Sequence, residues 1–326
     1  MIAVFTNIVK QMMCFSKKWY YKGISLFIKM GILIVSLVYI IQKISSGSLI
    51  EYFYNDQLRW NFFFVALLMV FINWGIEAYK WQFLIQRVER LSFDKALQSV
   101  LVGVTIGVFT PNRVGEFTGR VFYLNSENKI QATLISFVGS AFQLLVTLII
   151  GFSAFFFIAI ANEQAKFVLF ELFGSIYFLT GVILLIISIL VFLVFKKWIL
   201  KKYASYVVVL LSYSFKELLT IFFLSFFRYI IFTVQYYLVL KCFNIQLGFF
   251  LTCTLIALTF LVSSIIPTFA FTEITVRGAS AIYFFSLYVP DVSLVLASSM
   301  VVWLINLALP SLIGVFFIWK LKFFKN

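Results

Sequence analysis

Two short charged motifs interrupt long apolar stretches of this chain, and each places a glutamate four residues before an arginine. The first, PNRVGEFTGR, contains Glu116 and Arg120, and the second, PTFAFTEITVR, contains Glu273 and Arg277. Side chains four residues apart lie on one helix face, so each pair can neutralise itself. An unpaired charge at membrane depth costs about 2.5 to 3.5 kcal/mol on insertion scales. The spacing therefore predicts two buried ion pairs, and charge buried in a membrane indicates a functional site.

Each motif also begins with a proline, Pro111 in the first and Pro267 in the second. These prolines lie inside two interrupted apolar stretches, 94–127 and 248–287. A proline ends or kinks a helix because it has no backbone N–H and clashes with the preceding turn. We therefore expect a hairpin break at each proline, which gives two re-entrant hairpins or two pairs of broken helices.

Further charged side chains occupy the apolar segments outside the motifs. Glu77 and Lys80 share one helix face with Asn73, because the spacings are four and three, and Arg228 lies in the corresponding helix of the second half. The intramembrane cations are then Lys80, Arg113, Arg120, Arg228 and Arg277, and the anions are Glu77, Glu116 and Glu273. The surplus of positive charge favours an anionic guest bound by the five cations, with the three glutamates as their charge partners. The alternative is a set of structural salt bridges that hold the helices together.

The composition predicts the class of protein. Hydrophobic residues make up 63% of the 326 residues, and the mean hydropathy is +1.06, whereas soluble domains are about 45 to 50% apolar. We therefore predict an all-α, polytopic integral membrane helical bundle that forms a single membrane domain over residues 1–326. The chain has no histidine, and its three cysteines form no CxxC motif, which argues against zinc, haem and histidine-activated nucleophiles. We expect no catalytic residue, no metal and no cofactor.

Six uninterrupted apolar stretches are long enough to cross about 30 Å of hydrocarbon. They cover residues 24–42, 61–85, 131–160, 170–195, 218–240 and 291–319. Lysine concentrates at the ends of these stretches, and the positive-inside rule then places both termini and the 196–217 loop in the cytoplasm. The net charge of +14 does not indicate a nucleic-acid partner, since the chain has no soluble basic face.

This topology makes the helices at 61–85 and 218–240 antiparallel, although each introduces one copy of the motif. We therefore predict an inverted repeat, with residues 61–160 as the first repeat and 218–319 as the second. Inverted repeats with broken helices are typical of transporters, in which the two halves meet near the midplane and build the binding site.

Four segments together carry a family resemblance: NWGIEAYKW, LSFDKAL, TPNRVGEFTGR and IPTFAFTEITVRG. They resemble the flippase-like membrane domain of the lysylphosphatidylglycerol synthase family, the membrane half of the bacterial multiple peptide resistance factor, over about residues 24 to 319. The resemblance implies a bacterial inner-membrane protein whose partner is an anionic or aminoacylated membrane lipid. The matching motif positions are Arg113, Glu116, Arg120, Glu273 and Arg277. Bifunctional members continue into a soluble synthase domain, whereas this chain stops at Asn326, so we expect no synthase activity.

Three classes of function follow from these observations. We predict a membrane transporter: a flippase or binder of anionic or aminoacylated phospholipid or of polyprenyl-phosphate lipid. The alternatives are a non-transporting accessory or scaffold protein and an embedded lipid-modifying transferase. A transferase would need a general base, and each candidate (Glu77, Glu116, Glu273) has a basic residue three or four positions away, which makes it a poor base. A scaffold would not need a surplus of buried arginine.

Overall fold

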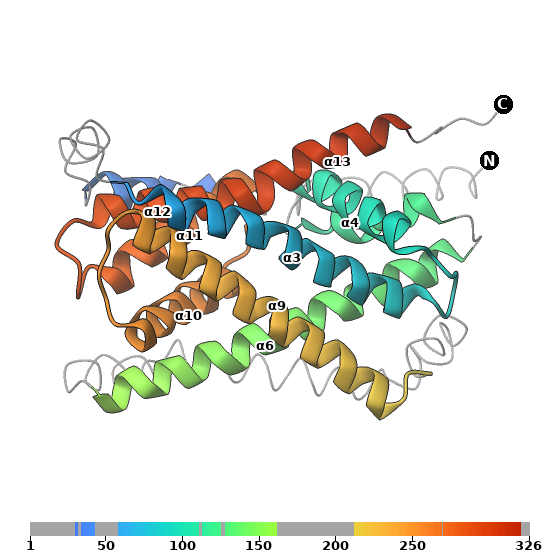
Figure 1. Cartoon of the computed structure of the whole chain (residues 1–326), viewed down its shortest axis with the longest axis horizontal. Coiled ribbons are helices and arrows are strands. Elements are labelled where there is room, and N and C mark those ends of the chain that lie inside the picture. Colours follow the sequence, from blue (N-terminus) through green and yellow to red (C-terminus); the bar gives the residue numbers. More distant parts are fainter. Residues whose placement is uncertain are drawn as a thin grey trace, which may run out of the picture.

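The computed structural model describes residues 30–31, 34–42, 58–110, 113–124, 128–161, 212–268 and 270–320. These residues form helices and connecting turns without a β-strand (Figure 1). Four helical stretches within the described ranges are long and apolar enough to cross a membrane, which confirms the predicted all-α membrane bundle. They are α3 (Trp60–Ile85), α6 (Lys129–Ala161), α9 (Phe215–Cys242) and the run formed by α12 (Val292–Trp303), η3 (Leu304–Ala308) and α13 (Leu309–Lys320). The predicted stretch at 170–195, most of the 196–217 loop and Pro111 lie outside the described residues.

The long helices α3 and α9 pack against each other through the centre of the bundle and run antiparallel (Figure 1). At one end the backbone N–H of Arg59 donates to the Cys242 carbonyl at 3.0 Å. At the other end Arg87 forms a 2.6 Å ion pair with Glu217. The contacts at both ends confirm the opposite directions predicted for these two helices.

The start of α9 is fixed by local hydrogen bonds. The Ser214 hydroxyl accepts from the Glu217 backbone N–H, and the Glu217 carboxylate accepts from the Ser214 backbone N–H at 2.7 Å. This capping box satisfies two backbone donors that the helix itself leaves free. The neighbouring Tyr213 hydroxyl donates to the Leu84 carbonyl at 2.6 Å, and burial raises the pKa of Tyr213 to about 12, so it stays a neutral donor. The Tyr213 hydrogen bond, next to the cap, therefore sets the register of α9 against α3.

The first interrupted stretch folds as a hairpin of α4 (Phe93–Val108), α5 (Gly115–Arg120) and the short η2 (Val121–Tyr123). The 16 residues of α4 are about 24 Å long and the six of α5 about 9 Å, so neither limb crosses 30 Å of hydrocarbon. The hairpin is therefore re-entrant: the chain leaves it into α6 at the end of the bundle where α3 ended (Figure 1).

Glycine allows the two limbs of this hairpin to approach closely. A Cβ added to Gly119 would lie 2.8 Å from the Cα of Gly103, and one added to Gly103 would lie 2.8 Å from the Glu116 carbonyl oxygen. Backbones in contact at this distance leave no room for a side chain. The same region is tied to α3, because the Ser99 hydroxyl accepts from the Trp81 indole at 2.9 Å and donates to the Arg120 carbonyl at 2.7 Å.

The second interrupted stretch forms α10 (Phe249–Ile265) and α11 (Ala270–Phe285), with Pro267 in the turn between them. Both breaks therefore fall where the motifs predict them, although Pro111 itself is outside the described residues. Because α9 is antiparallel to α3, α10 begins at the opposite end of the bundle from α4 (Figure 1). The two hairpins enter from opposite ends.

Each hairpin packs on the last long helix of the other half. The Thr105 hydroxyl of α4 donates to the Ser311 carbonyl of α13 at 2.7 Å, and Gly151 of α6 lies against Leu261 of α10. This exchange of contacts is the pattern that an inverted repeat would produce. The repeat boundaries at 61–160 and 218–319 remain a prediction.

Substituting Gly119 by alanine tests the close approach of the hairpin limbs. We expect Gly119→Ala to lower the free energy of unfolding by about 1 to 3 kcal/mol, the usual effect of overpacking, and so to lower the thermal midpoint in detergent. Gly75 in α3 is the matched control, because a Cβ there would meet nothing within 4 Å. Gly75→Ala should leave the midpoint unchanged or raise it, since alanine favours the helix. Equal midpoints for the two variants would contradict the glycine contact.

Candidate functional site

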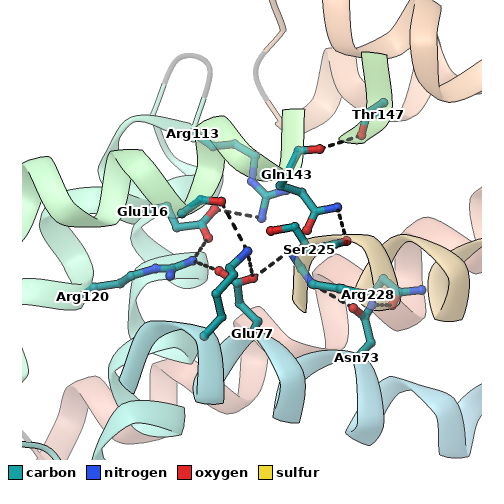
Figure 2. A network of polar contacts seen from close by, with 12 residues as sticks. Asn73, Glu77, Arg113, Glu116, Arg120, Gln143, Thr147, Ser225 and Arg228 are labelled. Carbon is teal, nitrogen blue, oxygen red and sulfur yellow. Dashed lines mark hydrogen bonds and ion pairs between the residues drawn. The ribbon is translucent and has the colours of Figure 1, made fainter. Parts of the chain in front are cut away.

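The centre of the site is Glu77, a carboxylate on α3 that is only 2% exposed. Its oxygens lie 2.7 Å from Lys80 Nζ, 2.8 Å from Arg120 Nη2 and 3.0 Å from Arg228 Nη1. These cations come from α3, α5 and α9, so one carboxylate joins three helices that are distant in sequence (Figure 2). A charge buried to this extent is tolerated only because it is paired and hydrogen-bonded.

A second carboxylate, Glu116, extends this ion cluster towards the tip of the first hairpin. It lies 2.5 Å from Arg120 Nη2 and 3.4 Å from Arg113 Nη2 (Figure 2). Lys80 donates in addition to the Gly139 carbonyl of α6 at 3.3 Å. Two carboxylates are thus shared by four cations.

Two asparagines hold Arg228 in place. Arg228 Nε donates to Asn73 Oδ1 at 2.9 Å, and Asn73 Nδ2 donates to Asn306 Oδ1 at 3.0 Å. Asn306 lies in η3, a π-helical segment of five residues. Pro310 follows four residues later and has no N–H for the Asn306 carbonyl, which explains the local change of helix type.

A cavity of about 470 Å³ lies beside this cluster, between the tips of the two hairpins. Its charged lining consists of Arg113, Arg228, Arg277 and Glu273. Arg277 forms a 2.8 Å ion pair with Glu273 on α11, and its guanidinium lies over the rings of Phe232 and Phe260. Asn73 and Arg228 are near the midpoints of α3 and α9, so the cavity is at mid-height of the two long helices.

Several cavity-lining residues carry a buried donor atom that has no hydrogen-bond partner among the described residues. They include the indole Nε1 of Trp74 and of Trp303 and the Nε of Arg113 and of Arg277. A buried donor without a partner costs about 1 to 3 kcal/mol, so such groups are rare unless a ligand or water satisfies them. These atoms are themselves inaccessible, so a ligand in the cavity would reach them only after a shift of the side chains.

The structure divides the five predicted binding residues into two groups. Arg113, Arg228 and Arg277 line the cavity, together with Pro267. Lys80 and Arg120 are not among the lining residues, because Glu77 holds them where their side chains are only 1% and 2% exposed. The spacing of the five cations in the sequence does not distinguish those that line the cavity from those that Glu77 holds.

Asn306, Gln143, Trp74 and Trp303 also line the cavity and were not predicted as site residues. Gln143 and Asn306 are amides deep within long apolar stretches, and this is the signal that could have found them. The tryptophans carry no such signal in a chain so rich in aromatic residues. No cluster of metal-ligating side chains occurs among the described residues.

These features define a polytopic helical membrane protein with a cationic cavity between two helical hairpins. The chain belongs to the lysylphosphatidylglycerol synthase transmembrane family, whose model, the lysylphosphatidylglycerol synthase TM region, matches residues 26–314. This confirms the family resemblance noted in the sequence. A search of curated proteins gave no significant match, and neither did a search of solved structures.

Glu77→Gln tests the ion cluster. The substitution leaves Lys80, Arg120 and Arg228 without their shared counter-charge, and removing one member of a buried ion pair costs about 3 to 5 kcal/mol. We expect a large fall in the thermal midpoint in detergent. Glu217→Gln is the control, because its ion pair with Arg87 is partly exposed, and it should have a small effect. If the thermal midpoints of Glu77→Gln and Glu217→Gln were equal, the ion cluster would not be a stabilising element.

Arg113 has a backbone φ of 56°, in the left-handed region that side chains other than glycine rarely adopt. This conformation costs about 1 to 2 kcal/mol, so an arginine at this position lowers the stability of the fold. Arg113→Gly removes both the strain and the guanidinium, whereas Arg113→Ala removes only the guanidinium. We expect the glycine variant to be more stable than the alanine variant by about 1 kcal/mol, measured from their thermal midpoints in detergent. A midpoint for Arg113→Gly no higher than that for Arg113→Ala would contradict the strained conformation.

Proposed function

We propose that this protein binds the headgroup of an anionic lipid in the cavity and transfers it across the membrane. The observation that carries the proposal is the set of three arginines, Arg113, Arg228 and Arg277, around a cavity at mid-height of the spanning helices. The planar guanidinium donates to phosphate or carboxylate through two parallel hydrogen bonds. Three arginines around one cavity at membrane depth are therefore suited to a phosphate-bearing guest.

The surroundings of the cavity favour a lipid over a soluble anion. Ile265, which lines the cavity at the tip of the second hairpin, is 62% exposed, and Val114, next to Arg113 at the tip of the first, is 54% exposed. Large apolar side chains at membrane depth face hydrocarbon, where a lipid keeps its acyl chains. A headgroup in the cavity and acyl chains outside it would match this distribution of polar and apolar surface.

The arrangement of the hairpins supports transfer rather than binding alone. The two hairpins enter from opposite ends of the bundle, and their tips flank the same cavity. Alternate closure of one tip or the other would open the cavity to each side in turn, as in transporters built from inverted repeats. The family is named for the synthase of lysylphosphatidylglycerol, which makes aminoacylated phospholipids guests to be tested. Anionic phospholipids and polyprenyl-phosphate lipids are tested beside them, because they carry the phosphate that suits the arginines.

An accessory or scaffold protein is the second candidate, since the Glu77 cluster alone could serve only to hold the helices together. An embedded transferase is less well supported, because Glu273, the one carboxylate among the described residues that line the cavity, is ion-paired with Arg277. A paired carboxylate is a weak general base. We therefore propose transport rather than catalysis.

We further propose that the protein is located in the bacterial inner membrane, with the end carrying Lys95 and Lys216 in the cytoplasm, as the positive-inside rule requires. Single cysteines in a cysteine-free background check this. Lys95→Cys and Lys216→Cys should resist an impermeant maleimide in intact cells. Gln246→Cys, in the connection between α9 and α10 at the opposite end, should react. The reverse pattern would invert the proposed orientation.

Reconstitution into liposomes tests transport directly. With a headgroup-labelled anionic lipid and an impermeant quencher, we expect the wild type to expose inner-leaflet label and an Arg113, Arg228 and Arg277 triple-alanine variant to lose that activity. Each charge-assisted bidentate contact contributes about 1.5 to 3 kcal/mol, so even one replacement should weaken lipid binding by about tenfold or more. Arg90→Ala, outside the cavity, is the control. Equal scrambling by the folded triple variant and the wild type would reject the transport role and favour a scaffold.

A further inference from the structure

The charges buried within this bundle do not cancel. The cluster and the cavity together contain five cations and three carboxylates, the residues named above. Every other acidic or basic side chain in the described part of the chain lies at a helix end or in a connection between helices. Two positive charges therefore have no counter-charge at this depth among the described residues. Charges in a medium of low dielectric constant are costly unless they are neutralised.

The ion pairs locate this surplus. Lys80 and Arg120 are almost fully buried and lie within 2.8 Å of Glu77, and Arg120 also lies 2.5 Å from Glu116. These two cations are sufficient to neutralise the two carboxylates. Arg113 and Arg228 therefore carry the excess.

These two arginines are also the members of the cluster that reach the cavity. Their side chains are 30% and 20% exposed, and Arg113 approaches Glu116 no closer than 3.4 Å. Arg277 adds no surplus, because Glu273 neutralises it. The cavity consequently presents two unmatched positive charges to whatever occupies it.

We infer that the preferred ligand of this cavity is a lipid whose headgroup is a phosphomonoester, which carries close to two negative charges near neutral pH; this inference rests on the proposed function. A phosphodiester lipid has a single charge and would leave one arginine unmatched. A phosphomonoester supplies both counter-charges and three acceptor oxygens, which suit the guanidinium groups that line the cavity. The ligand class is thus a lipid monophosphate, on either a diacylglycerol or a polyprenyl chain.

Two lipids that differ by one methyl group test the inference. Phosphatidic acid is a phosphomonoester, and its methyl ester with the same acyl chains is a phosphodiester with one charge. Binding of each is measured by native mass spectrometry of the wild-type protein in competition with phosphatidylcholine. We expect phosphatidic acid to bind at least tenfold more tightly than the methyl ester, and the methyl ester more tightly than phosphatidylcholine.

A pair of variants tests whether charge balance causes the preference. Arg277→Gln reduces the surplus from two charges to one, whereas the Glu273→Gln, Arg277→Gln double variant removes a neutral pair and keeps the surplus at two. Both variants lack the Arg277 contact and should bind phosphatidic acid more weakly than the wild type. We expect the single variant to lose most of the preference for phosphatidic acid over its methyl ester, and the double variant to keep that ratio of affinities. Lys95→Gln, an exposed change at the start of α4, should behave as the wild type.

The outcomes separate the inference from the proposed function. Equal binding of phosphatidic acid and its methyl ester, both above phosphatidylcholine, would overturn the inference and leave anionic-lipid binding intact. Loss of the preference in the double variant as well would also overturn the charge-balance argument. If no anionic lipid bound above phosphatidylcholine, the proposed function itself would fail. Displacement of phosphatidic acid by an equal concentration of glycerol 3-phosphate would show that the cavity recognises a soluble phosphate ester instead.

Discussion

The structure depends on the neutralisation of one buried carboxylate. Glu77 is ion-paired to cations from three helices, which belong to two parts of the architecture: α3 and α9 form the central pair, and α5 is the return limb of the first hairpin. Because a charge in the bilayer interior must be paired or hydrated, these helices cannot separate without exposing it. The carboxylate therefore fixes the position of the first hairpin relative to the central pair.

The two hairpins are held by different interactions. The first is in backbone contact through Gly103 and Gly119 and is bonded to α3 through Arg120 and Glu77. In the second hairpin, the Glu273–Arg277 ion pair is internal to α11, and Gly278 faces Leu296 of α12 rather than α10. The charged residues of the first motif thus connect different helices, whereas those of the second satisfy each other beside the cavity.

The sequence alone could predict most of this fold, because membrane helices are recognised by the length and apolar composition of their segments. The apolar stretch 61–85 differs by one residue from α3, and the breaks in both interrupted stretches fall at the motifs. The Glu-x3-Arg pairs also follow from helical periodicity. What periodicity cannot give is the sharing of Glu77 with Arg120 and Arg228, since these contacts join residues that are distant along the chain.

The division of the cations into buried and cavity-lining groups could not be predicted from the sequence for the same reason. All five cations lie within apolar stretches of the sequence. Which of them are neutralised depends on their distances from the carboxylates in the folded protein. The same geometry concentrates several costs in one place: the strained backbone of Arg113, the unpartnered donors and the unmatched charges all lie at one cavity. Strain and unsatisfied polar groups persist when the surrounding structure over-determines them, and they cluster at binding sites. The unmatched charge would be balanced by the entry of a group that brings negative charge and acceptor oxygens, and this is the physical reason for proposing that the cavity takes a phosphate-bearing ligand.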